Sequence, residues 1–479
     1  MQNPHTPPDY RYNLSAHIDT AYPQKPRFFI KTYGCQMNER DSEKMAALLL
    51  VMGFEAADSQ ETADLILYNT CCVRENAEDK IFGHLGRLKH LKADKPALII
   101  AVGGCMSQQS EMAQTLREKH RYVNLIFGTA NRHRLPEFLW RVMCGGERVA
   151  DITEGEELPE ITDIPVTTRE FSHKAGVNIM YGCDNFCSYC IVPYVRGREK
   201  SRPQADILHE AAALANDGVK EIMLLGQNVN SYAYDFPRLL REVNKIDGLE
   251  RIRFMTSHPK DFSDELVAAM RDLKKVCKSV HLPLQSGSTR ILADMNRKYT
   301  KEQYIALARK LTAIPDFALT TDIIVGYPSE TEADFLDTLD VVRQVRFAGA
   351  FTFIYSKRSG TPAAQREDSV PRKVANERFD RLTAELYPIF TEKNLAKVGG
   401  VVDVMVDEAA SPLVTSVECL GGSHNVTNSS EVGVVKYKGR TDDHTLVHFE
   451  AHEGLKAGDI VPVRVTEGKT FYVSGVGLD

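Results

Sequence analysis

Three closely spaced cysteines, Cys183, Cys187 and Cys190, constrain this chain more than any other feature of its sequence. They form a C-x3-C-x2-C pattern immediately after a predicted strand at residues 176–180. The loop is short enough for three sulfurs to wrap one cubic iron–sulfur cluster, and no fourth cysteine or histidine follows at ligand distance. A structural zinc site normally takes four protein ligands. The three cysteines, called the triplet below, therefore favour a four-iron cluster with one open iron over a zinc knuckle that lacks a ligand.

A second set of three cysteines is spread over the first part of the chain. Cys35, Cys71 and Cys105 each follow a predicted buried strand. Because the carboxyl ends of parallel strands line one crevice, we expect these thiols, called the strand-end set below, to meet there. They predict a second cluster with an open iron, and ordinary buried cysteines are the alternative. Cys72 could compete as a ligand, but its side chain should point elsewhere, so Cys71 is preferred.

Apolar runs alternate with amphipathic stretches of helical length over residues 27–145. The runs at residues 27–33, 64–70, 97–103 and 123–128 are typical of buried parallel strands. This alternation predicts an N-terminal doubly wound α/β domain. The polar, proline-containing residues 1–26 carry no apolar segment behind a basic start, so we expect a disordered leader without a secretory signal. An acidic stretch at residues 146–168 predicts a linker.

The same β/α rhythm resumes over residues 169–398. Six strands are predicted there, at residues 176–180, 221–225, 251–256, 279–283, 319–325 and 350–355. Six β/α units predict a partial (β/α)6 barrel rather than a complete eight-fold one. Short Val-rich alternating segments over residues 399–479 predict a small antiparallel β-barrel. The chain is thus expected to be a multidomain α/β protein with a C-terminal all-β domain.

Three separated motifs make the chain recognisable as a whole: TYGCQMN at residues 32–38, NTCCVREN at 69–76 and GCDNFCSYCIVPYVRGRE at 182–199. With them, residues 27–473 resemble the methylthiotransferases of the radical S-adenosylmethionine (SAM) class, with all three domains in family order. The motifs look like the MiaB branch, which modifies N6-isopentenyladenosine beside the tRNA anticodon. Two features depart from the family pattern. Cys72 stands where the family usually has Ser or Ala, and an extra segment lies at about residues 411–430.

The resemblance implies a tRNA methylthiotransferase with two [4Fe-4S] clusters and S-adenosyl-L-methionine. By resemblance, the strand-end set holds an auxiliary cluster that carries the sulfur, which one SAM methylates. The triplet holds the radical SAM cluster, which cleaves a second SAM, and the resulting 5′-deoxyadenosyl radical enables substitution of hydrogen at carbon 2 of the adenine. The target base must leave the anticodon-loop stack to reach the barrel. The implied partners are the tRNA anticodon stem-loop and an electron donor such as flavodoxin or ferredoxin, with the protein itself a monomer.

Polar residues at predicted barrel strand ends are candidates for SAM contacts, with ordinary turn residues as the alternative. They are Gln227, Asn228, Ser257, Gln285 and Asp322.

Two basic stretches are candidates for RNA phosphate contacts, with solvated charge runs as the alternative. The first would form an extended basic row beyond the triplet, and the second would lie in the C-terminal barrel, which resembles a TRAM domain. They comprise Arg196, Arg198, Lys200 and Arg202, and Lys436, Lys438 and Arg440.

The composition of the chain limits the classes of protein to which it can belong. The chain has 479 residues with a formal net charge of −6 and no apolar run long enough to span a membrane. We expect a cytoplasmic protein, in which clustered cysteines indicate metal or redox chemistry rather than disulfides. Residues 401–479 contain six Lys and Arg residues but twelve Asp and Glu residues. This acidic balance makes the C-terminal domain the weakest part of the RNA prediction.

Other functions remain open at this point. One is a methylthiotransferase that acts on threonylcarbamoyladenosine in tRNA or on a ribosomal protein. Another, of a different class, is a non-catalytic, metal-stabilised RNA-binding protein, which would favour zinc and complete ligand sets.

Overall fold

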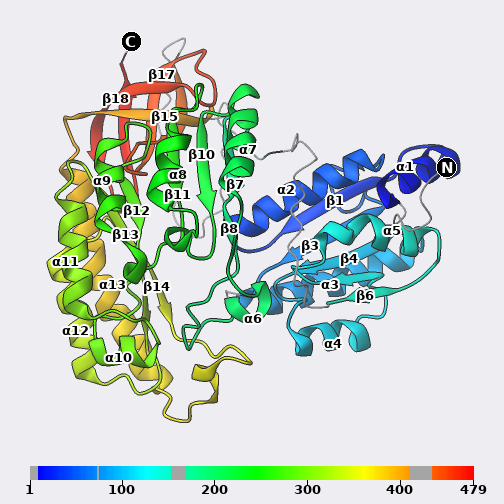
Figure 1. The fold of residues 1–479 in the computed structure, drawn as a ribbon, viewed down its shortest axis with the longest axis horizontal. Helices are drawn as coiled ribbons and strands as arrows, with labels where there is room; N and C mark the ends of the chain where they lie inside the picture. Colours follow the sequence, from blue (N-terminus) through cyan, green and yellow to red (C-terminus); the bar gives the residue numbers. More distant parts are fainter. Residues whose placement is uncertain (1–8, 73–74, 153–168, 170, 410–433, 479) are drawn as a thin grey trace, which may run out of the picture.

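The computed structural model describes residues 9–72, 75–152, 169, 171–409 and 434–478, which form three parts along the chain (Figure 1). The N-terminal part, blue to cyan, lies beside the central part in green and yellow. The small barrel, orange to red, covers one end of the central part. None of the described helices is long and apolar enough to cross a bilayer.

The N-terminal part is a six-stranded sheet in the order β2-β1-β3-β4-β5-β6, with every pair parallel. Hydrophobic clusters lie on both faces: α2 and α5 cover one, α3 and α4 the other. The predicted doubly wound α/β fold is confirmed. The strands are β1 (Arg27–Thr32), β2 (Glu55–Ala56), β3 (Leu65–Thr70), β4 (Ile99–Gly104), β5 (Leu125–Phe127) and β6 (Val149–Asp151), and the helices are α2 (Gln36–Val51), α3 (Glu75–Asp94), α4 (Ser110–Lys119) and α5 (Leu135–Met143).

The expected disordered leader at residues 1–26 is wrong over residues 10–21, which form a helix, α1 (Tyr10–Ala21). The Asp9 carboxylate caps this helix, and Leu14 and Ile18, one turn apart, are fully buried in the cluster shared with α2 and α5. Packing of this apolar pair thus outweighs the polar composition of the stretch. Residues 1–8 lie outside the described residues.

The expected linker also begins too early at residue 146, because β6 joins the first sheet. The Asp151 carboxylate accepts hydrogen bonds from Asn131 and Arg134, both at 2.6 Å. A three-residue strand is too short to show a period in the sequence. Residues 153–168 and 170 lie outside the described residues.

The central part consists of two parallel three-stranded half-sheets, β11-β10-β7 and β12-β13-β14. An isolated parallel bridge between Ile252 and Val276 links them, so the predicted partial six-stranded barrel is confirmed. The strands are β7 (Lys174–Asn178), β10 (Glu221–Leu225), β11 (Arg251–Phe254), β12 (Ser279–His281), β13 (Ala318–Val325) and β14 (Gly349–Ile354). The helices are α6 (Val192–Arg196), α7 (Gln204–Asn216), α8 (Phe236–Val243), α9 (Asp264–Asp272), α10 (Thr289–Asp294), α11 (Lys301–Thr312), α12 (Glu332–Val345) and α13 (Arg372–Leu395). A short hairpin pairs β8 (Met180–Tyr181) with β9 (Lys200–Ser201).

The C-terminal part is a closed five-stranded barrel in the order β15-β16-β17-β19-β18. Its strands are β15 (Val401–Ala409), β16 (Val434–Arg440), β17 (Leu446–His452), β18 (Ile460–Gly468) and β19 (Val473–Gly477). The predicted small barrel is confirmed, except that β17 and β19 pair in parallel. The extra segment at residues 411–430 lies outside the described residues.

Two buried arginines of β11 hold the C-terminal barrel against the central part. Arg251 donates to the backbone carbonyls of Arg440 and Asp403, at 2.7 and 2.9 Å. Arg253 donates to those of Thr441 and Asp442, both at 2.8 Å, and also pairs with a buried glutamate of β10. Because these bonds satisfy buried backbone carbonyls, they fix the barrel at one orientation.

Candidate functional site

The triplet lies in the loop that follows β8, on the side of the central part that faces the N-terminal part (Figure 1). The turn requires glycine at Gly182, where φ is +70° and a Cβ atom would lie 2.0 Å from the Arg198 carbonyl oxygen. Burial and then the neighbouring thiols raise the pKa of Cys190 to about 12, and burial raises that of Cys183 to about 11. These thiols therefore stay protonated at neutral pH until a metal binds and displaces their protons.

The strand-end set lies where the sequence predicts it, directly after β1, β3 and β4. Cys35 precedes α2 as its N-cap residue. The side chain of Cys71 fills the space beside Gly34: a Cβ atom there would lie 2.8 Å from the Cys71 sulfur. Cys105 is buried, and the Arg196 Nε atom donates to its sulfur at 3.2 Å. Burial raises the pKa of Cys35, the charge of Arg196 lowers it and the charge of Cys105 raises it, so Cys35 and Cys105 lie close to one another. Because Cys71 lies beside Gly34, the residue before Cys35, all three thiols belong to one region.

One expectation about this set is wrong. The Cys72 side chain does not point away from it but packs with Cys105, Ile191 and Val195 in a small buried cluster. A hydrogen bond from Cys72 is also the largest cause of the lowered pKa of Cys105, about 6. Side chains that follow a strand end are no longer bound to the alternation of the strand, so adjacent residues can both face one site. The preference for Cys71 as ligand stays a prediction.

The two cysteine sets fit iron–sulfur clusters by their donor chemistry. The strand-end set lies at the carboxyl end of a parallel sheet, and the triplet follows the β8 strand just beyond β7. Each set offers three sulfurs, which suits a four-iron cluster with one open iron. Within the described ranges, no three His, Cys, Asp or Glu side chains are already arranged as a metal-ligand group. The fit therefore rests on the convergence of the thiols and on the glycine that makes room for Cys71.

The Gly34 position gives a test of the strand-end set. Gly34→Ala should lose the iron bound there, because φ is +124° and the added Cβ atom would lie 2.4 Å from the Cys71 Cβ atom. Gly83→Ala is the matched control, since a Cβ atom at Gly83 would meet nothing within 4 Å. Iron analysis of anaerobically reconstituted protein measures both. Full iron content in Gly34→Ala would show that iron binding at the strand-end set does not depend on the present position of Cys71.

Gln227, Asn228, Ser257 and Gln285 follow barrel strands as predicted, whereas Asp322 lies within β13 rather than at its end. Three of the five candidates carry a buried polar atom that lacks a hydrogen-bond partner. These atoms are Gln227 Oε1, Asn228 Oδ1 and Ser257 Oγ. Such orphan atoms are rare in folded proteins unless a ligand or water satisfies them. Gln285 is buried with a φ of +67°, and Asp322 lies 3.3 Å from the His281 Nε2 atom. The set therefore fits a polar cofactor.

Sequence reasoning missed two further polar groups that follow barrel strands, one after β11 and one after β14. His258 Nε2 and the Tyr355 hydroxyl are buried without a partner. Burial, followed by the charges of Arg297 and Lys260, lowers the pKa of His258 to about 2, so this imidazole is neutral. His258 follows the predicted strand at residues 251–256, so the strand-end rule that selected Ser257 would have found it. Tyr355 lies inside the predicted strand at residues 350–355, but β14 ends one residue before it.

The predicted basic row after the triplet is wrong in half of its residues. Arg196 and Arg202 are buried: Arg196 pairs with Asp41 at 2.9 Å, and Arg202 with Glu210 at 2.7 Å. The stretch is not extended, because α6 ends at Arg196 and Gly197 turns the chain with a φ of +76°. Arg196 and Arg202 are therefore excluded as surface phosphate contacts.

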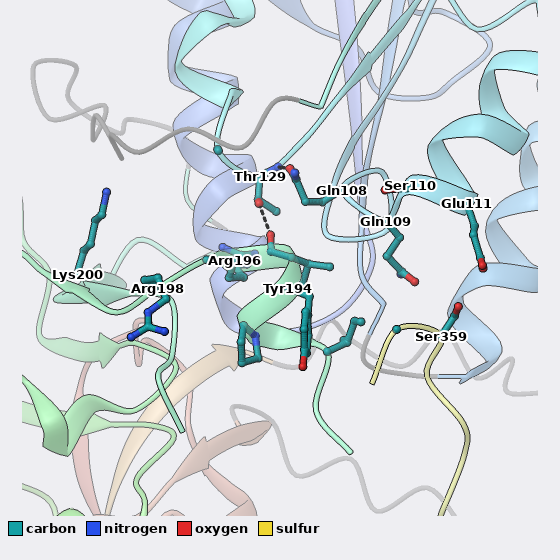
Figure 2. Close-up of a pocket in the computed structure, with 16 residues that line it drawn as sticks. Gln108, Gln109, Ser110, Glu111, Thr129, Tyr194, Arg196, Arg198, Lys200 and Ser359 are labelled. Carbon is teal, nitrogen blue, oxygen red and sulfur yellow. Dashed lines mark hydrogen bonds between the residues drawn. The ribbon is translucent and has the colours of Figure 1, made fainter. Parts of the chain in front are cut away.

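Arg198 and Lys200 do face solvent, and they line a cavity of about 1040 Å³ between the N-terminal and central parts. Figure 2 shows them on one side of this cavity, with Gln109 and Glu111 from the region of α4 on the other. Tyr194 lies between the two sides, and the Arg198 guanidinium stacks over a phenylalanine ring of the triplet loop at 5.2 Å. The cavity thus combines cations with an exposed aromatic ring, which is a common arrangement for RNA contacts.

The three cations of the C-terminal barrel alternate along β16, as their spacing predicts, with Tyr437 buried between the two lysines. Lys436 pairs with Glu450 at 3.6 Å, and Lys438 lines a cavity of about 520 Å³ on the barrel. Arg440 is less available, since it donates to the His444 carbonyl and lies 3.9 Å from Asp407.

Comparisons with known proteins agree with this architecture. Residues 27–128 match the model of the "Uncharacterized protein family UPF0004", and residues 177–342 match the Radical SAM superfamily. A curated "tRNA-2-methylthio-N(6)-dimethylallyladenosine synthase" of Acetivibrio thermocellus is 50% identical over 459 residues, 94% of this chain and 91% of that protein. A protein of the same name from Caldicellulosiruptor saccharolyticus is 55% identical over 387 residues, 79% of this chain and 82% of that protein.

Among solved structures, the radical SAM methyltransferase TsrM from Kitasatospora setae, with cobalamin and a [4Fe-4S] cluster bound, is similar with a TM-score of 0.54. The match covers 71% of this chain and 74% of that one at 14% sequence identity. At this identity the likeness shows the fold alone.

Proposed function

This chain belongs to the family of tRNA-2-methylthio-N(6)-dimethylallyladenosine synthases, and from that membership we propose which of its residues carry out the reaction. The chain is a radical SAM enzyme that attaches a methylthio group to N6-dimethylallyladenosine in tRNA, and its cofactors are [4Fe-4S] clusters and SAM. The alternatives, a threonylcarbamoyladenosine or ribosomal-protein substrate or a non-catalytic RNA-binding protein, have no comparable support.

We assign the triplet to the radical SAM cluster and the strand-end set to the auxiliary cluster. One observation carries the assignment: Arg196, at the end of the helix that follows the triplet, reaches into the N-terminal part and contacts Cys105. The two thiol sets are therefore held beside one another rather than at separate ends of the molecule. When bound, the clusters would supply an electron for SAM cleavage and a sulfur for transfer. The protein would hold the reacting groups at one junction and exclude water from it.

The SAM contacts are proposed to come from Gln227, Asn228, Ser257, Gln285 and Asp322. The three orphan atoms among them support this, because a cofactor with amino, carboxylate and ribose groups would satisfy them. The neutral imidazole of His258 and the Tyr355 hydroxyl extend the same polar lining.

An apolar surface inside the partial barrel is proposed to receive the dimethylallyl group. Phe351 and Phe353 of β14 are 60% and 44% exposed, although both are large and apolar. Their cross-strand partners are Asp322 and Ile324, on the face of β13 opposite to the helix-packed Ile323. That face is the barrel interior, where a flipped base would arrive beside SAM.

Substrate discrimination tests this proposal. Wild-type protein should modify a dimethylallylated anticodon stem-loop and leave the unmodified one largely unchanged. Phe351→Ala and Phe353→Ala together should reduce that preference by about tenfold or more, since burial of a small apolar group is worth ~1–3 kcal/mol. Phe471→Ala is the matched control, because Phe471 is 65% exposed and packs on Tyr387, outside the barrel interior. Equal activity of the wild type on both stem-loops, or activity only on a ribosomal protein, would contradict the assignment.

Of the seven predicted RNA contacts, Arg198, Lys200, Lys436, Lys438 and Arg440 remain proposals. Arg198→Gln with Lys200→Gln should weaken stem-loop binding and flatten its dependence on log[salt] by ~0.7 per lost phosphate contact. Iron content should not change. Fluorescence anisotropy over a salt series measures the slope. Arg241→Gln with Lys245→Gln is the charge-matched control, because Arg241 in α8 and Lys245 just after this helix are both exposed. Identical slopes in the two double variants would remove Arg198 and Lys200 from the RNA interface.

The oligomeric state, the cellular location and the electron donor of the protein are also proposals. We propose a cytoplasmic monomer that binds the tRNA anticodon stem-loop and accepts electrons from a flavodoxin or ferredoxin. The family's tRNA substrate supports the RNA partner, and the absence of a membrane-spanning helix among the described residues agrees with the location.

A further inference from the structure

A buried arginine contacts one sulfur in each cysteine set. The Arg297 Nη1 atom lies 3.5 Å from the Cys187 sulfur, and the Arg196 Nε atom lies 3.2 Å from the Cys105 sulfur. The two arginines are 5% and 8% exposed. They come from different elements: Arg297 follows α10, and Arg196 ends α6. The same arrangement therefore occurs twice, once at each candidate cluster site.

Arg297 has neutral partners apart from that sulfur. It donates to the Pro283 carbonyl at 3.0 Å and to the Tyr299 hydroxyl at 3.1 Å, and its guanidinium lies 5.2 Å from the Tyr299 ring centre. Burial lowers the pKa of Arg297, but the neighbouring Tyr299, Tyr189 and Cys187 raise it by more in total, so the net pKa is raised. Among the described residues it forms no ion pair with a carboxylate. Since a buried cation without an anion is costly, a cluster held by Cys187 would supply the missing negative charge.

Arg196 is held more tightly. Its Nη atoms donate to Asp41 at 2.9 Å and to Asn38 at 2.5 Å. Asp41 also lies 3.5 Å from Arg132, so one carboxylate serves two buried arginines. The surplus positive charge lies beside Cys105, and Asn38 in turn donates to the Thr70 carbonyl next to Cys71. This network fixes the guanidinium at one orientation toward the sulfur.

We propose that Arg297 and Arg196 are positioning residues that each donate a hydrogen bond to a ligand sulfur and so raise the reduction potential of one cluster independently of the other. The proposal rests on the assignment of Cys187 and Cys105 as ligands. A donor and a positive charge at a ligand sulfur stabilise the reduced cluster, which carries one more negative charge. Arg297 therefore eases electron entry at the SAM-cleaving site, and Arg196 acts on the auxiliary site.

Single-cluster proteins separate the two effects. With Cys35, Cys71 and Cys105 replaced by Ala, the full-length chain holds the triplet cluster alone, and an EPR-monitored redox titration reports its potential. Arg297→Gln should shift the reduction equilibrium at least tenfold toward the oxidised form, or about 59 mV for one electron. Arg297→Lys keeps the positive charge but lacks the planar guanidinium, so its reduction potential should lie between those of Arg297 and Arg297→Gln. Lys298→Gln, an exposed neighbour, should leave the potential unchanged.

The mirror experiment uses the chain with Cys183, Cys187 and Cys190 replaced by Ala. Arg196→Gln should lower the auxiliary potential, and Arg198→Gln, two residues on and exposed, should not. Arg297→Gln should have no effect in this background. A purely structural role predicts equal potentials in all variants, and that result would overturn the proposal.

Iron content distinguishes this proposal from the ligand assignment. If a triple cysteine variant still binds about eight irons, the assignment of the ligands is wrong, whatever the arginines do. If Arg297→Gln fails to load iron, the thermal unfolding midpoints of the iron-free variant and the iron-free wild type are compared instead. An unchanged or higher midpoint than wild type supports the proposal, because the iron-free wild type carries a buried cation without its anion. A lower midpoint contradicts it.

Discussion

Replacing Cys183, Cys187 and Cys190 by Ala should abolish 5′-deoxyadenosine formation and halve the iron content, from about eight to about four per chain. The triplet is the only cysteine set in the central part, which matches the Radical SAM superfamily. Cleavage of SAM requires an open iron close to the cofactor, and the orphan atoms of Gln227 and Ser257 lie at neighbouring strand ends. Chromatographic detection of 5′-deoxyadenosine under reducing, anaerobic conditions measures the effect.

A matched control for this variant is Cys144→Ala. Cys144 is an exposed cysteine at the end of α5, outside both sets, so its loss should change neither iron nor SAM cleavage. A triplet variant that still cleaves SAM would refute the assignment of the radical cluster. Retained iron with lost cleavage would instead show that other groups hold the cluster.

Replacing Cys35, Cys71 and Cys105 by Ala should stop methylthio transfer while SAM cleavage continues. The sulfur source is lost with this set, but the triplet and the barrel strand ends are untouched. Mass spectrometry of the stem-loop should detect no methylthio product, and 5′-deoxyadenosine should still form.

The single variants Cys71→Ala and Cys72→Ala decide between the adjacent cysteines. Cys71 lies against Gly34 and Cys72 against Cys105, so both are within the same region. We expect Cys71→Ala to lose the auxiliary cluster and Cys72→Ala to be nearly silent. Loss of the cluster only in Cys72→Ala would reverse the ligand choice.

The fold was largely predictable because its signals are periodic. Apolar runs marked β1, β3 and β4, and the strand-end rule brought three cysteines distant in sequence to one region. The α1 helix was missed because its signal is a single buried pair, Leu14 and Ile18, in a polar stretch. The β6 strand was missed because three residues cannot display a period.

The site was predictable in its cysteines and less so in its charges. Arg196 and Arg202 looked like surface cations, because sequence spacing does not reveal that α6 and the turn at Gly197 interrupt an extended row. Arg196 pairs with Asp41, which lies over a hundred residues away in the sequence. Arg202 pairs with Glu210, which lies on the following helix, α7. Buried ion pairs of this kind depend on tertiary contacts, which no local pattern encodes.

The most direct test of the whole account is an anaerobic reaction of the reconstituted protein with a dimethylallylated anticodon stem-loop and SAM labelled in its methyl group. Mass spectrometry of the digested RNA should show one adenosine that has exchanged a hydrogen for a methylthio group with the labelled methyl, formed together with 5′-deoxyadenosine. An RNA that stays unmodified while the protein holds both clusters and cleaves SAM would contradict the account.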